Sequence, residues 1–433
     1  MACQPENRGR RTPGSKSVCF KAHRCFSVGD AQGTPSGEIR HAPKVISVAG
    51  LAALLLSCMI SALHAQNFRD GLSAQLLDEL AKAKGGETIV LADGNYGALH
   101  IVDRAFPAYV TLKSANTHGA VFDSIIIDNS RFVRIDGVHV SNSSNGAASS
   151  AVVAVVGGSS DVEIINSEIN GLVDSDYNGF HGLYSNGRAK RITFANNYVH
   201  DVKNGGTFID TTDLKVIGNK IDYIGNDSFK FLSVTDVKIE NNIGATNLFP
   251  SENAHLDFIQ FQGGDSSDVV IRGNIFLPST RADVQGIFLA DAHYSNVLIE
   301  QNIIVTGMIR GISVTSGTDV VAKNNTVLHV KGRGSKATFI IVDGKSYGNI
   351  QSSYIGHSGL GLMDGNLNIQ STDPNSEWHY GRYFANADRG LGITISDLAP
   401  VSGSAVENFG AYDRLVEALA HSLGDAKGPR ITP

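Results

Sequence analysis

The fold is decided by the segment Asp236-Val-Lys-Ile-Glu-Asn-Asn242 and by six similar segments elsewhere in the chain. Each alternates apolar and polar residues and closes on a turn residue. The closing residues follow one another at intervals of 22 to 32 residues and are Ser167, Asn197, Asn219, Asn242, Asn274, Asn302 and Asn325. Alternation before a turn is typical of a half-buried β-strand, and repetition at this period is typical of stacked repeats.

A repeat of this length holds short strands and tight turns, and it cannot bury its own apolar face unless copies stack. Helical periodicity is absent between the copies, and the 47 glycines and 42% apolar residues suit a turn-rich chain with a continuous core. We therefore predict an all-β fold, a single-stranded parallel β-helix over residues 87–398. A solenoid grows by adding coils, so 433 residues are compatible with one elongated domain.

Both ends of the predicted solenoid carry helical patterns. Residues 70–84 place apolar side chains at positions 72, 76, 77 and 80 on one helical face, and Gly85-Gly86 ends the pattern. We predict a capping helix within residues 66–86, which would cover the open end of the first coil and its unpaired backbone groups. Residues 399–433, with a helical pattern over 413–423, are predicted to form a second cap and a tail.

The first 65 residues are predicted to be a leader. An almost uncharged stretch, Val45 to Leu63, follows Lys44 and closes near Ala65, as a secretory signal does; a membrane anchor is the alternative. Residues 1–40 are unusual before a signal and suggest an over-called start codon. Cys58 lies in a variant of the bacterial lipobox, so a lipoprotein is a second possibility for a protein otherwise expected to be secreted or periplasmic.

Charge and cysteine content narrow the function classes. All four cysteines precede Ala65, so the mature chain needs no disulfides. The leader holds eight Lys/Arg and three Asp/Glu, which leaves a mature chain of net charge −11 where the whole chain has −6. That sign is wrong for nucleic acid binding. No Rossmann or P-loop motif or zinc-ligand spacing occurs, so we expect no organic cofactor. We also expect a monomer, without a membrane span in the mature chain.

One segment resembles a known family. Glu87-Thr-Ile-Val-Leu-Ala-Asp-Gly-Asn-Tyr96, placed between the capping helix and the coils, is similar to the opening of bacterial right-handed β-helix polysaccharide enzymes of the pectate lyase-like superfamily. These include alginate lyases, chondroitinase B and mannuronan C5-epimerases. The resemblance implies right-handed coils. It leaves the function open, because this fold hosts lyases, hydrolases, epimerases and adhesins.

Candidate site residues are those that do not repeat. The recurring Asn column is best explained as a ladder that satisfies turn backbone groups, because a catalytic residue is needed only once. Two coils are longer than the others, and they contain the segments 174–184 and 250–260, with 225–231 between them. If the apolar residues of these segments face inward, period-two alternation turns Tyr184, Lys230 and Gln260 outward on equivalent strands. His181, Asp227, His255 and Asp257 would then lie beside them.

Such a cluster suits chemistry on a uronic acid polymer. Cleavage by β-elimination needs the carboxylate neutralised, the C5 proton removed and the departing O4 protonated. We predict Tyr184, Lys230 and His255 as catalytic residues, in which Lys230 or His255 takes the C5 proton and Tyr184 gives a proton to O4. The Tyr and Lys roles are implied by the resemblance to certain alginate lyases that pair these residues across neighbouring coils. The predicted substrate-binding residues are His181, Asn226, Asp257, Gln260 and Arg188. Each could instead be an ordinary surface or structural residue, and a one-residue shift in register would dissolve the cluster.

Calcium is a further expectation. Asp174, Asp176 and Asn178 match the first half of a calcium loop with Gly179 at the sixth position, whereas Ser185 stands where the motif requires Glu. A turn rich in Asp and Asn is the alternative interpretation. A bridging cation would help an anionic protein to hold a polyanion.

The leading functional prediction is an exported lyase that cleaves a uronate-containing polysaccharide, such as alginate or an acidic exopolysaccharide. A C5-epimerase shares its first two steps. A glycoside hydrolase would need two carboxylates, for which Asp227 and Asp257 are the candidates. A surface protein or adhesin that binds carbohydrate without catalysis is the fourth class.

Overall fold

The computed structural model describes residues 72–142, 151–174, 179–244, 254–333, 338–352 and 359–424. All of them belong to one compact unit, Ile60–Pro433. The predicted leader, residues 1–65, therefore lies outside the described part of the chain. No described helix is both long and apolar enough to cross a membrane.

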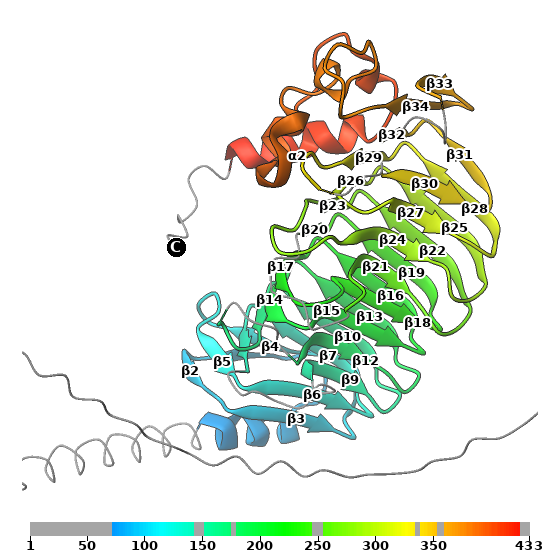
Figure 1. Cartoon of the computed structure of the whole chain (residues 1–433). Helices are drawn as coiled ribbons and strands as arrows, with labels where there is room; N and C mark the ends of the chain where they lie inside the picture. Colours follow the sequence, from blue (N-terminus) through cyan, green and yellow to red (C-terminus); the bar gives the residue numbers. More distant parts are fainter. Residues whose placement is uncertain are drawn as a thin grey trace, which may run out of the picture. The chain divides into compact units, whose positions relative to one another are not determined.

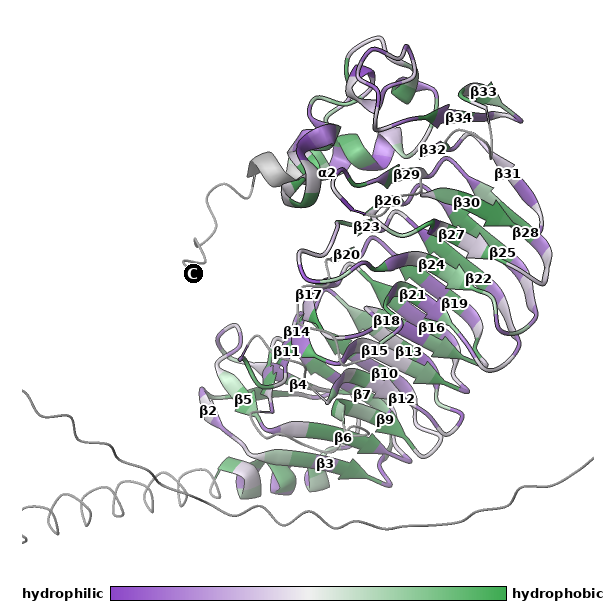
Figure 2. Cartoon of the chain, viewed as in Figure 1, coloured by the Kyte–Doolittle hydropathy of each residue, from purple (hydrophilic) through white to green (hydrophobic). Residues whose placement is uncertain are grey.

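The described strands form the predicted parallel β-helix, in which each coil contributes one strand to each of three sheets (Figure 1). We name the sheets A, B and C in the order in which the first coil visits them. All neighbouring strands pair in parallel except β33 and β34, which are antiparallel. Along the strands, hydrophobic and hydrophilic residues alternate (Figure 2). The expected all-β solenoid is confirmed.

Sheet A consists of β1 (Thr88–Leu91), β4 (Ala105–Ser114), β7 (Arg131–Asp136), β10 (Ser160–Ile165), β13 (Lys190–Ala195), β16 (Thr212–Ile217), β19 (Thr235–Glu240), β22 (Ser266–Arg272), β25 (Tyr294–Glu300), β28 (Gly317–Lys323) and β31 (Lys345–Tyr347). Sheet B consists of β2 (Gly94–Asn95), β5 (Ala120–Phe122), β8 (His139–Ser141), β11 (Glu168–Asn170), β14 (Tyr198–Val202), β17 (Lys220–Ile224), β20 (Ile243–Gly244), β23 (Ile275–Phe276), β26 (Ile303–Thr306), β29 (Thr326–His329), β32 (Ile350–Ser352), β34 (Asn366–Ile369) and β33 (Gly361–Met363). Sheet C consists of β3 (Ala98–Val102), β6 (Ser124–Asp128), β9 (Ala151–Val156), β12 (His181–Ser185), β15 (Asn204–Ile209), β18 (Phe229–Leu232), β21 (Asp257–Phe261), β24 (Gln285–Leu289), β27 (Arg310–Val314) and β30 (Phe339–Val342).

Each repeated segment is a strand of sheet A between two sharp bends. The first residue of the segment that begins at Asp236 has φ 54°, and Asn241, just before the closing residue, has φ 57°. Asp, Asn and Gly adopt this left-handed conformation more readily than other residues. This preference explains why these three residue types recur at both ends of the segment.

The closing asparagines form the predicted ladder at the corner between sheets A and B. The Asn274 side chain donates to Ile239 O at 2.8 Å and accepts from the backbone N–H of Asn242 at 3.0 Å. The same pattern repeats from coil to coil, and Asn349 and Asn366 continue it beyond the predicted positions. The structural interpretation of the column is confirmed, because every amide satisfies the backbone of a neighbouring coil.

The core of the solenoid is a set of stacked side chains. Phe208, Phe231 and Phe261 occupy equivalent positions in sheet C, and their ring centroids lie 5.1 and 4.7 Å apart. All three are fully buried. Inward-facing columns of this kind fix the register, because a shift by one residue would bring polar side chains into the core.

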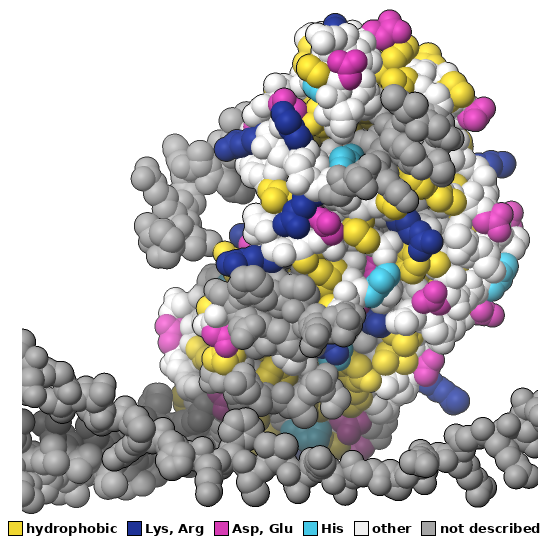
Figure 3. All heavy atoms as spheres, viewed as in Figure 1, with side chains coloured by type: hydrophobic (Ala, Val, Ile, Leu, Met, Phe, Trp, Pro, Cys, Tyr) yellow, Lys and Arg dark blue, Asp and Glu magenta, His cyan; other side chains and the backbone are white. Residues whose placement is uncertain are grey.

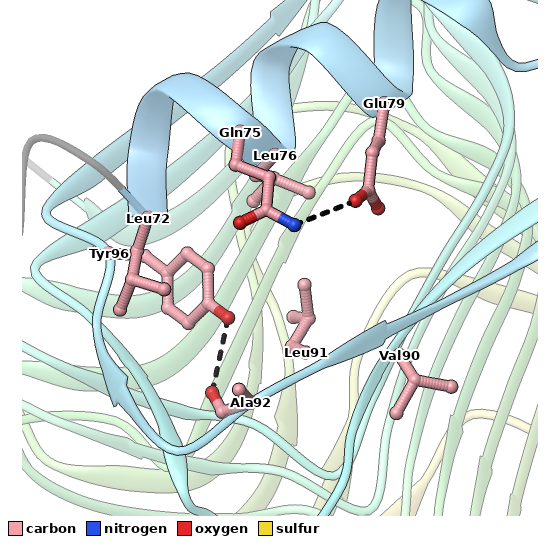
Figure 4. Close-up of a pocket in the computed structure, with 8 residues that line it drawn as sticks. All are labelled: Leu72, Gln75, Leu76, Glu79, Val90, Leu91, Ala92 and Tyr96. Atoms are coloured by element: carbon pink, nitrogen blue, oxygen red, sulfur yellow. Dashed lines mark hydrogen bonds between the residues drawn. The ribbon is translucent and has the colours of Figure 1, made fainter.

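A helix over residues 72–82 covers the first coil, within the predicted range. Leu76 and Leu80 are buried against Leu91 and Tyr96, whose hydroxyl donates to Ala92 O at 3.1 Å (Figure 4). Leu77, which was predicted on the same face, is 50% exposed. The core-facing stripe is therefore narrower than the sequence pattern suggests.

The C-terminal segment differs from the prediction in place and extent. The strands end at Ile369, before the predicted boundary at 398. Four short 3-10 helices follow, and they are η1 (Tyr380–Arg382), η2 (Ala387–Gly392), η3 (Ile395–Leu398) and η4 (Ala405–Glu407). The last helix is α2 (Tyr412–Gly424).

This segment packs on the outer face of sheet B and does not simply close the last coil. Its residues Phe384, Leu398 and Leu415 share a second hydrophobic core with Ile275 and Ile303 of that sheet. Arg414 of α2 donates to Gly273 O at 2.5 Å. The apolar outward residues of sheet B in these coils explain the arrangement, since they would otherwise be exposed to water.

Candidate active site

The candidate site lies on the outer face of sheet C. The register places Tyr184, Thr207, Lys230, Gln260 and Phe288 in one row across β12, β15, β18, β21 and β24. Their neighbours along the strands, such as Phe229 and Phe231, point into the core and are fully buried. The predicted alternation is therefore correct for Tyr184, Lys230 and Gln260.

A second row lies three residues before the first row on each of these coils and contains two buried carboxyl groups. It holds His181, Asn204, Asp227, Asp257 and Gln285. The side chains of Asp227 and Asp257 are both 0% exposed. Two carboxyl groups in adjacent coils, away from water, make it costly for both to be ionised.

Asp227 has the more strongly raised pKa of the two carboxyl groups. Its Oδ1 accepts from the backbone N–H of Asp257 at 3.1 Å, and its Oδ2 accepts from the amide of Asn226 at 2.9 Å. Burial, with a smaller contribution from the charge of Asp257, raises the pKa of Asp227 to about 8. Lys230 Nζ lies 3.9 Å from Asp227 Oδ2 and opposes this shift only in part.

His255 and Asp257 form a dyad that reaches solvent. His255 Nδ1 lies 2.9 Å from Asp257 Oδ2, and the His255 side chain is 55% exposed. The hydrogen bond to Asp257 raises the pKa of His255. Burial raises the pKa of Asp257, although His255 counteracts it. The Gln285 amide lies 2.5 Å from His255 Nε2. An imidazole oriented by a buried carboxylate is suited to general base catalysis.

Asp257 also carries an unused acceptor. Its Oδ1 is buried and has no hydrogen-bond partner among the described residues. The prediction placed Asp257 in contact with substrate. Its carboxylate is fully buried and contacts His255 in this geometry, which suits a positioning role, and contact with substrate stays a prediction.

His181 and Tyr184 lie at the N-terminal end of the two rows. His181 Nδ1 is 2.9 Å from Thr207 Oγ1, and Tyr184 OH accepts from the Asn186 amide at 2.8 Å. Burial lowers the pKa of His181 to about 4, and the positive charges of Lys203 and Lys230 add to the effect. His181 is therefore neutral at neutral pH.

The structure brings the predicted residues into one row but not into one cluster. Asn226, Lys230, His255, Asp257 and Gln260 lie on or beside the adjacent strands β18 and β21. Strand β15 separates Tyr184 from Lys230. The pairing across neighbouring coils that the resemblance implied is thus not present. The prediction failed here because the Gly-rich segment 204–209 was not recognised as a strand of sheet C.

The remaining predicted residues lie elsewhere or outside the described structure. Arg188 is exposed in the turn after β12, with φ 67°, and no described ion pair or hydrogen bond connects it to the row. Asp174 is described, whereas Asp176 and Asn178 are not. No group of three or more described His, Cys, Asp or Glu residues is arranged to hold a metal ion. The calcium loop stays a prediction.

Sequence reasoning missed Asn204, Thr207, Gln285, Phe288 and Arg310. A signal for two of them was present. Asp257-Phe-Ile-Gln-Phe261 and Gln285-Gly-Ile-Phe-Leu289 share one pattern, in which a polar first residue is followed by apolar residues at the third and fifth positions. Aligning the strands on that pattern would have placed Gln285 beside Asp257 and Phe288 beside Gln260.

Replacement of Asp227 with asparagine should make stability less dependent on pH. Burial raises the pKa of Asp227 to about 8 in the folded protein, while the ordinary value for the unfolded chain is 3.8. Between these values the folded state binds more protons, so the free energy of unfolding falls as pH rises. Urea denaturation of Asp227→Asn across this range should show a smaller fall.

The exposed Asp319 provides a control, because Asp319→Asn changes the same group at a solvated position. An unchanged pH slope in Asp227→Asn would show that Asp227 is ionised in the folded protein.

Comparison with known proteins addresses the fold. Residues 123–263 match the family model of a right handed beta helix region. No curated protein sequence matches the chain. Similar solved structures include the surface adhesin PfbA of Streptococcus pneumoniae, with 12% identity, coverage of 72% of this chain and 92% of that chain, and a TM-score of 0.45.

Two enzymes are also among the similar structures. A PL6 family alginate lyase variant has 14% identity and a TM-score of 0.45, over 82% of this chain and 58% of that chain. The pectate lyase Pel9A has 14% identity and a TM-score of 0.39, over 75% of this chain and 83% of that chain. With the sheet topology and the family match, the fold of this chain is a right-handed parallel β-helix.

Proposed function

We propose that this protein is a polysaccharide lyase that cleaves a uronate-containing polymer by β-elimination. The observation that carries the proposal is the half-exposed His255, held by the buried Asp257 carboxylate beside Lys230 and Gln260. The predicted signal sequence, if used, would deliver the enzyme to a compartment where such polymers occur.

The proposed reaction divides its tasks among His255, Gln260 and Lys230. In its neutral form, with Nδ1 oriented by Asp257, His255 takes the proton from C5 of the uronate at Nε2 once the substrate displaces the Gln285 amide from that atom. Gln260 donates to the uronate carboxylate, and the Lys230 ammonium stabilises the negative charge that develops there. The electrons of the C5–H bond form the C4–C5 double bond while the C4–O4 bond breaks. O4 leaves with a proton.

Lys230 is the proposed donor of that proton. It lies one coil from Gln260, and coils are about 4.8 Å apart. Tyr184, the donor expected from the sequence, is three coils from β21, or roughly 14 Å. One base and one acid must act on adjacent atoms of the same sugar linkage, so we assign Tyr184 and His181 to binding of a more distant sugar.

The buried carboxyls argue against hydrolysis. A glycoside hydrolase needs an acid and a base or nucleophile that both reach the sugar. Asp227 and Asp257 are both fully buried, so neither reaches a sugar in this geometry. A passive adhesin would not need the His255–Asp257 dyad. An epimerase differs only in returning a proton to C5, so it is distinguished by product.

The test is to incubate the protein with alginate and a panel of other acidic polysaccharides, with and without calcium. A lyase produces unsaturated uronate ends, detected by ultraviolet absorbance, and shorter chains. Lys230→Ala should lose most of this activity, whereas Lys238→Ala, an exposed lysine on sheet A, should retain it.

Other products would replace the proposal with a specific alternative. Shorter chains without new absorbance would indicate a hydrolase. A changed uronate composition at constant chain length would indicate an epimerase. Binding without any change in the polymer would indicate an adhesin.

A further inference from the structure

Arg310 places a cation beyond the proposed reacting centre. It is exposed at the start of β27, and its guanidinium carbon lies 5.1 Å from the centroid of the Phe288 ring. Phe288 is in register with Gln260, which is in register with Lys230. The Phe288 ring also contacts His255, with centroids 5.5 Å apart. Ser313 takes the register position beside Phe288, and the guanidinium of Arg310 reaches the Phe288 ring from the same strand β27.

The charge of Arg310 is not neutralised within the described structure. Other arginines on the solenoid form ion pairs, such as Arg134 with Glu163 and Arg272 with Glu300. No described carboxylate lies within 4.0 Å of Arg310. In a chain of net charge −6, this unpaired cation lies beside the candidate site. Over the region of β21, β24 and β27, the surface shows Lys, Arg and His side chains (Figure 3).

The spacing of the row suits a polymer that bears regular negative charges. Lys230, Gln260 and Phe288 lie on three successive coils. The backbones of Lys230 and Phe288 are therefore about 9.6 Å apart. A polyuronate carries one carboxylate per sugar. Arg binds carboxylates through two parallel hydrogen bonds, and a guanidinium resting on an aromatic ring is already ordered for such contact.

We propose that Arg310 binds the carboxylate of a uronate unit next to the one at Lys230 and Gln260, so that the polymer crosses the strands of sheet C along the solenoid axis. This inference rests on the proposed function. It adds the direction in which the polysaccharide runs and a second subsite for a carboxylate. Packing over Phe288 is the alternative role for Arg310, and the experiment separates the two.

The experiment measures equilibrium binding of alginate, polygalacturonate and hyaluronate to full-length protein that carries His255→Ala, so that no cleavage occurs. Arg310→Met removes the charge but keeps an apolar cover on Phe288. It should weaken binding of the recognised polymer about tenfold, as the loss of a charged hydrogen-bonded contact does. Arg131→Met, on the exposed sheet A strand β7, makes the same charge change and should have no such effect.

Oligosaccharide length gives a second measurement. The loss of binding affinity caused by Arg310→Met should be seen with long oligosaccharides and should be absent with those too short to span from Lys230 to Phe288. Thermal unfolding of Arg310→Met should match that of the parent.

The outcomes separate the inference from the proposed function. Equal binding of a recognised polymer by Arg310→Met and its parent would overturn the subsite and leave the lyase proposal intact. An equal loss of binding affinity in Arg131→Met would show that only the net charge of the protein matters, and it would also overturn the subsite. Failure of the parent to bind any polymer, together with failure of the native protein to cleave one, would overturn both.

Discussion

His255→Ala is expected to lower kcat/KM on the cleaved polymer by about 10³-fold, the size of effect that a positioned general base contributes. The His255 side chain is 55% exposed, so its imidazole can reach a substrate, and its Nδ1 is held by Asp257. His255 lies two residues before β21, and the carboxyl group of Asp257 on that strand is fully buried, so Asp257 does not replace His255 as the base. Initial rates of unsaturated product formation measure the loss.

His293→Ala is the control for this prediction. His293 is exposed beside sheet A and should be dispensable for activity. Retention of more than about a tenth of the activity by His255→Ala would remove His255 from the role of base. In that case Lys230, the alternative base from the sequence, would be the next residue to test.

Asp257→Asn tests the positioning role through a readout other than rate. The Asp257 carboxylate raises the pKa of His255. Without that charge the imidazole stays neutral to lower pH, so the acid limb of the kcat/KM profile should move to lower pH. Asp257 acting only in folding would change stability without moving that limb.

Asn274→Ala is expected to destabilise the protein by roughly 3 kcal/mol, because it leaves more than one buried backbone group without a partner. The Asn274 amide serves Ile239 O on one side and the Asn242 N–H on another, and its side chain is fully buried. Water cannot replace the amide at this corner without opening the stack. Urea denaturation followed by circular dichroism gives the change in midpoint and slope.

The comparison variant is Asn375→Ala, in an exposed turn after the last parallel strand, where a change within about 0.5 kcal/mol is expected. A small effect at Asn274 would mean that the ladder contributes little beyond what the backbone pairing already provides.

The repeat architecture could be predicted because its signals are local. The bend residues at both ends of the segment closing at Asn242, and the alternation between them, are properties of a few adjacent residues. Their recurrence then requires stacking. The same logic identified the Asn ladder, since a residue that serves each coil must appear in each coil.

The candidate site could be predicted only in part. Period-two alternation placed Lys230 and Gln260 correctly, because it depends on the strand alone. Counting coils between Tyr184 and Lys230 failed, because β15 begins with Asn204-Gly-Gly and lacks the apolar pattern of a strand. The packing of η3 and α2 against sheet B could not be predicted either, because the sequences of these helices are not part of the repeat.

By itself, the sequence determined the coil, its period and the side chains that face outward, because these follow from neighbouring residues and their backbone preferences. Only the tertiary structure decided which of two similar aspartates would have its pKa raised to about 8 and which would orient His255. That choice depends on burial and on the hydrogen bonds between coils. It also placed Arg310 over Phe288, a contact between residues of separate coils that no local pattern encodes.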